Sequence, residues 1–470
     1  MNNLNAYIWN FINKFGSQLI WLVTTMVLAR FLSAEEFGVI GVLSIIFMVA
    51  NTLTESGLGG ALVIQTNLKK EDCSTISVFN IVVSISIYII IFVFADKIES
   101  FYNVDGLAHV TRVLSLVFVI NAWGIVPRTI MYRELRFKVM CIVSLIAVTI
   151  SSIVAIILAY FGFGVYALVS YQLIVALINT MGLYMCSHYH ADFHFSMASF
   201  RKLFGFGFYT TITGVLDTVY ENILATIFGK FLNITQAGYL SQAKKIEEAT
   251  AQSLLSTVNN TAFPILAKKT NDLDSFKKEA DSIITMVPLL VFPILMTIGV
   301  FSKEIICIMF GEKWLPASEY LSLLVIAGLF MIFDAINRNF IKSLGMVKKL
   351  FVYTVIKRVI GCGVIILFAF MSVHVVLYGY ILSALLGFIL NCHLYSKLVG
   401  ENFFFNMRKS LKSLSALLPL YLCLYLIYFL IQNELFRIMI CLVLLTFFYI
   451  VILPQYGIDI LAKIKSLIHK

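Results

Sequence analysis

The sequence predicts an all-α integral membrane protein with 12 to 14 transmembrane helices, in two parallel pseudo-symmetric six-helix lobes plus a C-terminal helix pair. Three observations predict this class: a membrane-like composition, apolar stretches of spanning length, and a one-sided distribution of Lys and Arg. Of the 470 residues, 60% are hydrophobic and 13% are charged, whereas a soluble domain carries about 25% charged residues. No polar linker divides the chain into soluble domains. The fold must therefore be built within a bilayer.

Fourteen stretches are apolar over about the 20 residues that a helix needs to cross a bilayer. The N-lobe, residues 1–190, should hold six of them: 7–29, 36–56, 75–95, 108–127, 139–160 and 164–186. The C-lobe, residues 200–400, should hold six more: 203–228, 235–265, 282–301, 318–341, 350–371 and 374–396. The C-terminal pair and cytoplasmic tail, residues 410–470, should hold the last two: 413–432 and 436–455. Very short turns at 7–56 and 139–186 leave the number of spans at 12 to 14.

Lys and Arg gather in every second connection, as they do in loops on the cytoplasmic side of a membrane. With the N-terminus inside, the even connections and the C-terminal end hold 22 of these residues, and the odd connections hold 6. A wrong number of helices would mix the two sets. We therefore expect both termini to be cytoplasmic. The same bias accounts for the net charge of +10, so no nucleic-acid partner is expected.

The sequence offers little sign of cofactor, metal or nucleotide chemistry. The eight Cys are dispersed and form no C-x-x-C pair, so they are interpreted as small hydrophobic residues. His188, His190 and His194 lie in a short connection without Cys or a clear acidic partner, which disfavours a metal site. No P-loop, dinucleotide fingerprint or nucleophile elbow occurs. We expect no cofactor and no enzymatic activity.

An internal repeat relates the two predicted lobes. Residues 30–41 align without gaps with residues 230–241, and Phe31, Leu32 and Gly38 have identical counterparts. Conservative pairs in the same register include Ser33 with Asn233. The copies lie six predicted helices apart, an even number, so both should have the same orientation in the membrane. Because transporters are commonly built from such repeats, we expect two parallel lobes related by an axis along the membrane normal.

Several motifs lie between residue 1 and about residue 400. They are Phe15-Gly-Ser-Gln18, Leu28-Ala-Arg-Phe-Leu-Ser-Ala-Glu-Glu-Phe-Gly38, Glu55-Ser-Gly-Leu-Gly-Gly-Ala-Leu62 with Gln65, Gly229-Lys-Phe-Leu232, Gly238-Tyr-Leu-Ser-Gln-Ala243 and Phe263-Pro264. In these motifs the chain resembles the Wzx-type polysaccharide flippases of the multidrug/oligosaccharidyl-lipid/polysaccharide exporter superfamily. It looks most like the branch with colanic-acid exporters and teichuronic-acid translocases. That branch often has an Asn-x-Asp-like element where this chain has Tyr220-Glu-Asn-Ile223.

The resemblance implies a flippase that moves undecaprenyl-pyrophosphate-linked oligosaccharide repeat units across the bacterial inner membrane by alternating access. It implies the lipid bilayer, a polysaccharide polymerase and chain-length machinery as partners in surface polysaccharide biosynthesis. The alternative is a cation-coupled small-molecule or drug antiporter of the same superfamily. A membrane enzyme is disfavoured because no connection is long enough for a catalytic domain. Coupling to H⁺, to Na⁺ or to no ion stays open, as does the glycan.

Basic residues inside the predicted spans are candidates for binding the pyrophosphate. Ionised groups are costly in hydrocarbon and often mark functional sites. The six candidates are Lys14, Lys244, Lys245, Arg338, Lys357 and Arg358. A structural role stays open for Lys244 and Lys245, which precede Glu247 and Glu248 at the spacing of same-helix ion pairs. Snorkelling toward the cytoplasmic face stays open for others, such as Lys14.

Acidic residues inside the predicted spans are candidates for ion coupling. They are Glu55, Asp217, Glu221 and Asp334. Asp217 and Glu221 lie four residues apart on one predicted helix, so they repel unless one is protonated or both meet a cation. Pairing with a neighbouring helix is the alternative for these two. Asp334 lies four residues before Arg338, so their mutual neutralisation is as consistent with the sequence as ligand binding.

Overall fold

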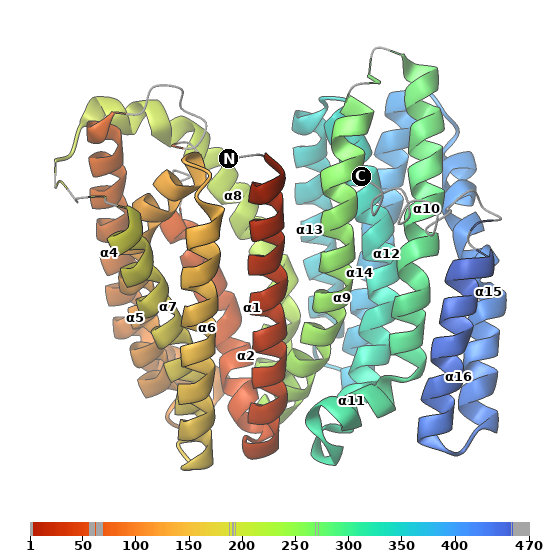
Figure 1. Cartoon of the computed structure of the whole chain (residues 1–470), viewed down its shortest axis with the longest axis horizontal. Coiled ribbons are helices and arrows are strands. Elements are labelled where there is room, and N and C mark those ends of the chain that lie inside the picture. Colours follow the sequence, from red (N-terminus) through yellow and green to blue (C-terminus); the bar gives the residue numbers. More distant parts are fainter. Residues whose placement is uncertain are drawn as a thin grey trace. The chain divides into compact units, whose positions relative to one another are not determined.

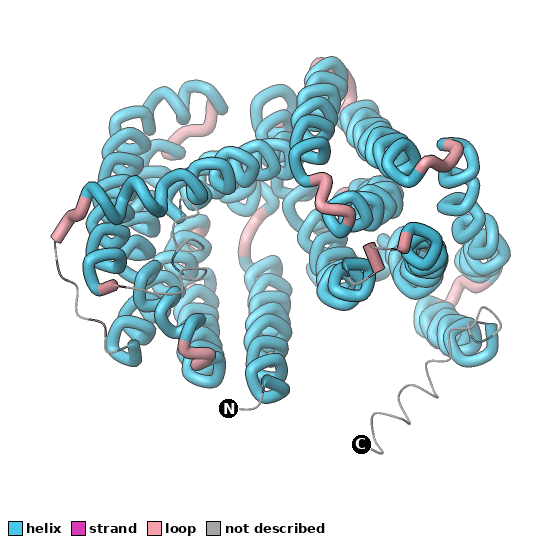
Figure 2. The backbone as a smooth tube through the Cα atoms, turned by 90° about the horizontal axis from the view of Figure 1, so that it is seen from above, coloured by secondary structure: helices cyan, strands magenta, loops and turns pink. Residues whose placement is uncertain are grey.

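The computed structural model describes residues 3–55, 62, 69–187, 189, 192, 194–267, 269–270, 272–452 and 454. Every regular element in these ranges is a helix (Figure 2). Eleven of the described helices are long and apolar enough to cross a membrane, and a shorter apolar helix covers Met439–Ile450. The predicted all-α membrane fold is thereby confirmed.

The chain forms two compact units, Met1–Ser241 (unit 1) and Gln242–Lys470 (unit 2). Unit 1 contains α1 (Asn3–Phe31), α2 (Ala34–Glu55), α4 (Lys70–Tyr102), α5 (Leu107–Arg133), α6 (Phe137–Tyr160), α7 (Val165–Ser187), α8 (Met197–Ile227) and η1 (Phe228–Leu232). The boundary falls within α9 (Ile234–Ala267). Unit 2 continues with α10 (Leu273–Val300), α11 (Ser302–Phe310), η2 (Glu312–Trp314), α12 (Ala317–Ser343), α13 (Val347–Phe368), α14 (Val373–Val399), α15 (Phe403–Leu430), α16 (Glu434–Phe447) and η3 (Phe448–Ile452). The lobe boundaries expected from the sequence stay a prediction.

Each predicted apolar stretch coincides with a helix, but several helices are longer than the stretch. The helix α4, for example, covers Lys70–Tyr102 where 75–95 is predicted. Its acidic first turn, with Glu71 and Asp72, is helical although it is not apolar. Apolarity marks the part of a helix that crosses hydrocarbon, whereas backbone hydrogen bonding continues into the polar ends. The short helix α11 is missing from the prediction because nine residues cannot cross a bilayer.

The same helix pairings occur in both units (Figure 1). In unit 1, α4 packs on α5, while α5 and α6 both pack on α7. In unit 2, α10 packs on α12, while α12 and α13 both pack on α14. These are corresponding helices if residues 30–41 and 230–241 are repeats. The repeated packing is the result expected from an ancestral duplication.

Apolar side chains cover the outside of the helices. In the most apolar part of α4 only 22% of the residues are buried. Ile90 and Val93 of this helix are exposed, whereas its Asn80 and Ser84 are fully buried. This is the reverse of the arrangement in a soluble protein, and it is stable only where lipid covers the exposed face.

The repeated segments begin their helices with equivalent caps. The Ser33 N–H donates to Glu36 Oε2 over 2.6 Å, and the Glu36 N–H donates to Ser33 Oγ over 3.3 Å. This reciprocal pair is a capping box at the start of α2. At the start of α9, the Gln236 N–H donates to Asn233 Oδ1 over 2.8 Å. The conservative replacements between the repeats thus preserve residues that satisfy the free N–H groups of a helix start.

The two helix starts also contact each other through bare backbone. A Cβ atom added to Gly38 would lie 2.0 Å from the carbonyl oxygen of Ile234, and one added to Gly238 would lie 1.8 Å from that of Ala34. The contacts are reciprocal, since Ile234 and Ala34 are themselves equivalent positions of the repeat. Such a two-way contact is what a local pseudo-two-fold axis produces. Close approach of this kind is typical of small residues in membrane helix pairs.

We predict that Gly38→Ala destabilises the protein, whereas Gly41→Ala does not. The added methyl group at position 38 must displace the α9 backbone, and overpacking typically costs about 1 to 3 kcal/mol. At position 41 the nearest atom to an added Cβ is 3.5 Å away, so the better helix propensity of Ala should dominate. Thermal unfolding of both variants in detergent measures the difference. Equal melting temperatures for the two would show that the crossing can relax.

Candidate functional site

A polar cleft lies along α1 in unit 1. It measures about 430 Å³ and is lined by Asn13, Lys14, Ser17, Gln18, Trp21, Ser144, Val148 and Tyr171. Small residues bring α1 close to α6: an added Cβ on Gly16 would lie 3.0 Å from Leu145 Cδ2. Deeper in the same contact, the Thr24 hydroxyl donates to Ser152 Oγ over 2.7 Å. The close packing of these two helices holds the lining residues in fixed relative positions.

Cation, amide and aromatic groups meet in this cleft. Lys14, Gln18 and Trp21 follow one another at spacings of four and three residues, so they share one face of α1. Lys14 is exposed in the cleft. The ring centroids of Trp21 and Tyr171 are 4.5 Å apart, which gives the cleft an aromatic wall. An ammonium beside hydroxyl and amide groups can bind phosphate, and aromatic faces can pack against the C–H faces of sugar rings.

A buried charge cluster joins α12, α13 and α14 in unit 2. The Lys357 ammonium donates to Asp334 Oδ2 over 2.7 Å. The Asn391 amide donates to the other carboxylate oxygen, Oδ1, over 2.6 Å. Gly387 makes room for this arrangement, because a Cβ there would lie 2.9 Å from Lys357 Cδ. Both oxygens of Asp334 are therefore occupied by groups from neighbouring helices.

Further cations act on the Asp334 carboxylate. Arg338 and Arg358 also act electrostatically on the Asp334 carboxylate. Asp334, Lys357 and Arg358 are buried, with 8%, 5% and 7% of their surface exposed, and Arg338 is half-buried. The Asp334 carboxylate thus has one directly bonded ammonium and two guanidinium groups that act on it. Buried cations attract an anionic ligand, because charge interactions are strong where water is excluded.

The sequence pairs Asp334 with Arg338 by helical spacing, but the structure gives Asp334 a different direct partner. That partner is Lys357 of α13. Spacing within one helix is visible in a sequence, whereas the packing of α12, α13 and α14 that brings Lys357 and Asn391 to Asp334 is not. Asn391 is a functional candidate that the sequence analysis missed. Its only sequence signal is an amide within an apolar stretch.

The remaining cationic candidates lie on α9. Lys244 forms the expected same-helix ion pair with Glu248, at 3.2 Å. Lys245 is half-buried. Glu247 is buried beside Gly328 of α12, where an added Cβ would lie 2.7 Å from Glu247 Oε1. These charges are therefore engaged in packing α9 as well as being candidates for a ligand.

The acidic candidates other than Asp334 occupy two helices of unit 1. On α8, Asp217 is half-buried and Glu221 is exposed, one helical turn apart. Glu55 is the last residue of α2, but its side chain lies outside the described residues. The Gly-rich motif that follows Glu55 lies largely outside them as well, as do His188 and His190.

The chain matches a known family over most of its length. Residues 27–319 match the family described as polysaccharide biosynthesis protein. The succinoglycan biosynthesis transport protein ExoT of Rhizobium meliloti is 25% identical over 76% of this chain and 72% of that protein. The lipopolysaccharide biosynthesis protein WzxC of Escherichia coli is 25% identical over 66% of this chain and 63% of that protein. The teichuronic acid biosynthesis protein TuaB of Bacillus subtilis is 23% identical over 68% of this chain and 67% of that protein.

Solved transporter structures share the fold. The lipid II flippase MurJ in an inward closed conformation aligns over 96% of this chain and 100% of that chain, with a TM-score of 0.76 and 15% identity. An inward-facing multidrug resistance MATE family transporter aligns over 81% of this chain and 95% of that chain, with a TM-score of 0.64 and 13% identity. At such low identity the likeness concerns the fold alone.

We predict strong energetic coupling between Asp334 and Lys357. Lys357→Met alone leaves a buried carboxylate without its ammonium, and breaking a buried pair typically costs about 3 to 5 kcal/mol. Adding Asp334→Asn removes the orphaned charge, so the double variant should regain much of the lost stability. Unfolding of the two single variants and the double variant in detergent gives the coupling energy. Additive effects of the two substitutions would show that the pair contributes no net interaction.

Proposed function

This chain belongs to the polysaccharide biosynthesis protein family, and on that premise we propose that it flips undecaprenyl-pyrophosphate-linked oligosaccharide repeat units across the inner membrane. The match confirms the resemblance seen in the sequence motifs. The chain is a multi-pass membrane transport protein and not an enzyme, since its family and relatives are named for polysaccharide biosynthesis and transport. Alternating access is the transport mechanism that we propose.

The observation that carries the proposal is the gathering of cations in the α12–α14 cluster. Lys357, Arg338 and Arg358 all act on Asp334 within helices of a membrane protein. A pyrophosphate carries compensating negative charge and accepts charge-assisted hydrogen bonds from Lys and Arg. We propose that the pyrophosphate contacts Lys357, Arg338 and Arg358 in unit 2. Lys244 and Lys245 of α9 are the further candidates in this unit.

The polar cleft of unit 1 has side chains that could bind the sugar part of the proposed substrate. Its hydroxyl and amide groups suit sugar hydroxyls, and the Trp21–Tyr171 wall suits the apolar faces of sugar rings. We propose that Lys14 contacts phosphate in the same cleft. This combination of hydroxyl, amide, aromatic and ammonium groups is not specific for one sugar. Such a lining is expected where recognition is spread over many weak contacts.

A cation-coupled drug antiporter of the same superfamily is the alternative. Its common cargo, an organic cation, would be repelled by Lys357, Arg338 and Arg358, whereas an anionic lipid-linked cargo would be attracted. The family match also favours polysaccharide biosynthesis. We therefore prefer the lipid-linked oligosaccharide, with H⁺ or Na⁺ coupling as a separate question.

We further propose that the Lys- and Arg-rich connections and both ends of the chain face the cytoplasm. This orientation follows from the charge bias of the connections. Thiol labelling of a cysteine introduced between residues 268 and 281, in intact and opened cells, reports the side. We propose a polysaccharide polymerase and chain-length machinery as the proteins that use the flipped product.

We predict that neutralising Lys14 and Arg338 together abolishes export in cells that lack the native gene. Such cells should lose the surface polymer and accumulate the lipid-linked unit on the cytoplasmic leaflet, and the wild-type gene should restore export. Each lost charge-assisted contact costs about 1.5 to 3 kcal/mol, or roughly 10- to 150-fold in affinity. Single Gln variants should be partly active because the other cations compensate. Surface glycan and undecaprenyl-linked intermediates are measured.

Two matched variants separate charge from folding in this experiment. Lys14→Arg with Arg338→Lys keeps both charges and should retain more export than the Gln pair. Lys69→Gln with Lys70→Gln removes two exposed cations at the start of α4 and should export normally. Normal export by a well-expressed Lys14→Gln/Arg338→Gln protein would show that these two cations do not bind the substrate.

We predict that Asp217→Asn with Glu221→Gln impairs transport while protein abundance stays near normal. We propose that these two acids on α8, together with Glu55 and Asp334, are the groups that take up H⁺ or Na⁺. A carboxylate pair one turn apart binds a cation or shares a proton, and its amide counterpart cannot. The control Asp105→Asn/Glu134→Gln removes two exposed acids outside α8. Full complementation by the α8 variant would exclude both acids from coupling.

A further inference from the structure

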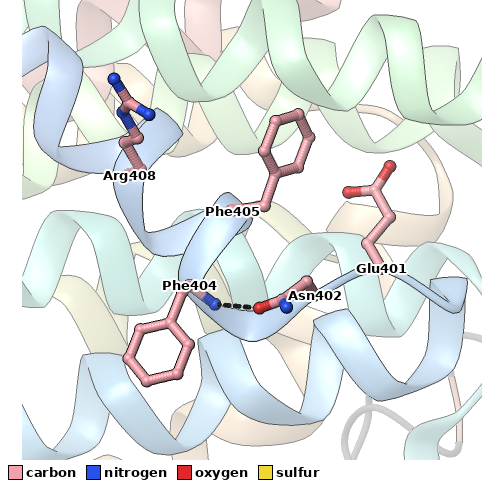
Figure 3. A pocket seen from close by; sticks show the side chains of 5 residues that line it. All are labelled: Glu401, Asn402, Phe404, Phe405 and Arg408. Carbon is pink, nitrogen blue, oxygen red and sulfur yellow. Dashed lines mark hydrogen bonds between the residues drawn. The ribbon is translucent and has the colours of Figure 1, made fainter.

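A second cavity lies where α14 connects to α15, and none of its lining residues belongs to the charge cluster. It measures about 410 Å³ and is lined by Glu401, Asn402, Phe404, Phe405 and Arg408. In Figure 3 the Phe405 ring stands between the Arg408 guanidinium and the Glu401 carboxylate. The Asn402 side chain accepts the Phe404 N–H over 2.8 Å and so begins α15. The proposed transport function does not use this cavity.

The single carboxylate of the cavity is already neutralised. Glu401 lies 3.5 Å from the Lys409 ammonium and 3.9 Å from that of Lys277. Lys409 is further held by Asp281 of α10 at 2.7 Å, and its ammonium lies 4.3 Å from the centre of the Phe405 ring. These contacts fasten α15 to α10. They also leave the negative charge of Glu401 unable to neutralise other cations.

Three cations lie on the two helices that meet at the cavity, and one of them, Arg408, lines it. Arg408 and Lys412 of α15 and Lys397 of α14 are exposed. Within the described part of the chain, none of the three has a carboxylate partner. Arg408 and Lys412 lie one helical turn apart, so they can contact one anion together. The cavity edge therefore carries net positive charge.

Exposed apolar groups connect the cavity to the lipid-facing surface. Phe404 is 75% exposed and Phe405 is 54% exposed. Along the same face of α15, at helical spacing from Phe404 and Arg408, lie Leu411, Leu418 and Leu422, which are 39%, 57% and 51% exposed. A cation directly above a row of exposed leucines matches a lipid with its phosphate at the cation and its acyl chain along the row.

We propose that this cavity binds the headgroup of an anionic glycerophospholipid. Arg408 and Lys412 contact the phosphate, and Phe404 and Phe405 lie beside the glycerol and the upper acyl chains. The lipid belongs to the leaflet on the side of the Lys- and Arg-rich connections, where anionic headgroups attract basic residues. A net-neutral headgroup would leave the local positive charge uncompensated. The bound lipid would hold the start of α15 at the membrane surface.

Native mass spectrometry of the purified full-length protein tests the proposal. The protein in neutral detergent is titrated with dioleoyl phosphatidylglycerol or with dioleoyl phosphatidylcholine. Arg408→Gln/Lys412→Gln should lose one tightly bound phosphatidylglycerol, with its affinity lowered by about 30-fold, and should bind phosphatidylcholine as the wild type does. The charge-preserving Arg408→Lys/Lys412→Arg variant should keep the lipid.

A matched control fixes the interpretation. Lys348→Gln/Lys349→Gln removes two exposed cations at the start of α13 and should leave the tightly bound phosphatidylglycerol in place. The proposal is overturned if both Gln pairs lose the lipid equally, or if phosphatidylcholine binds the wild type as tightly as phosphatidylglycerol. It is also overturned if undecaprenyl phosphate displaces the lipid at far lower concentration than phosphatidylglycerol itself binds, which would assign the cavity to the carrier. Export activity is not the readout, so the transport proposal is tested separately.

Discussion

The bare-backbone contacts of Gly38 and Gly238 are the constraint that holds α2 against the start of α9. No side chain separates α2 from α9 at this point, so each helix start rests directly on a carbonyl of the other. Equivalent caps at Ser33 and Asn233 place the two glycines at the same distance from their helix starts. Beyond this contact α9 continues into unit 2 and carries Lys244, Lys245 and Glu247. The position of the first turns of α9 thus depends on glycine at positions 38 and 238, because a Cβ atom at either position would collide with a backbone carbonyl.

Much of the fold could be predicted from the sequence because the signals are local. A run of apolar residues specifies a spanning helix wherever it lies, and every second connection records its side of the membrane through Lys and Arg. Lys14, Gln18 and Trp21 share a helix face that spacing alone reveals. Local signals fail for α11, which is too short to cross a bilayer, and for the polar ends of α4, which are helical without being apolar.

The candidate site was less predictable because its contacts join separate helices. Tyr171 reaches the cleft only because α7 lies near α1, and Asn391 reaches Asp334 only because α14 packs on α12. The choice of Lys357 over Arg338 as the direct partner of Asp334 depends on the same packing. The sequence does single out these residue types as unusual in a membrane span, since buried charge must be compensated. A single amino-acid sequence does not show which of these charges form pairs, because the partners lie on different helices.

The Asp334–Lys357 pair bears on how a transporter could bind an anion and still release it. An empty site with only cations would be costly, because an unpaired buried charge destabilises a protein by several kcal/mol. Asp334 removes this cost by holding Lys357 while the site is empty. Under the proposed function, an arriving pyrophosphate would share or replace Asp334 at the ammonium, so its affinity would be a difference between two similar interactions. Such an exchange keeps binding moderate, and moderate binding is what permits release on the far side of the membrane.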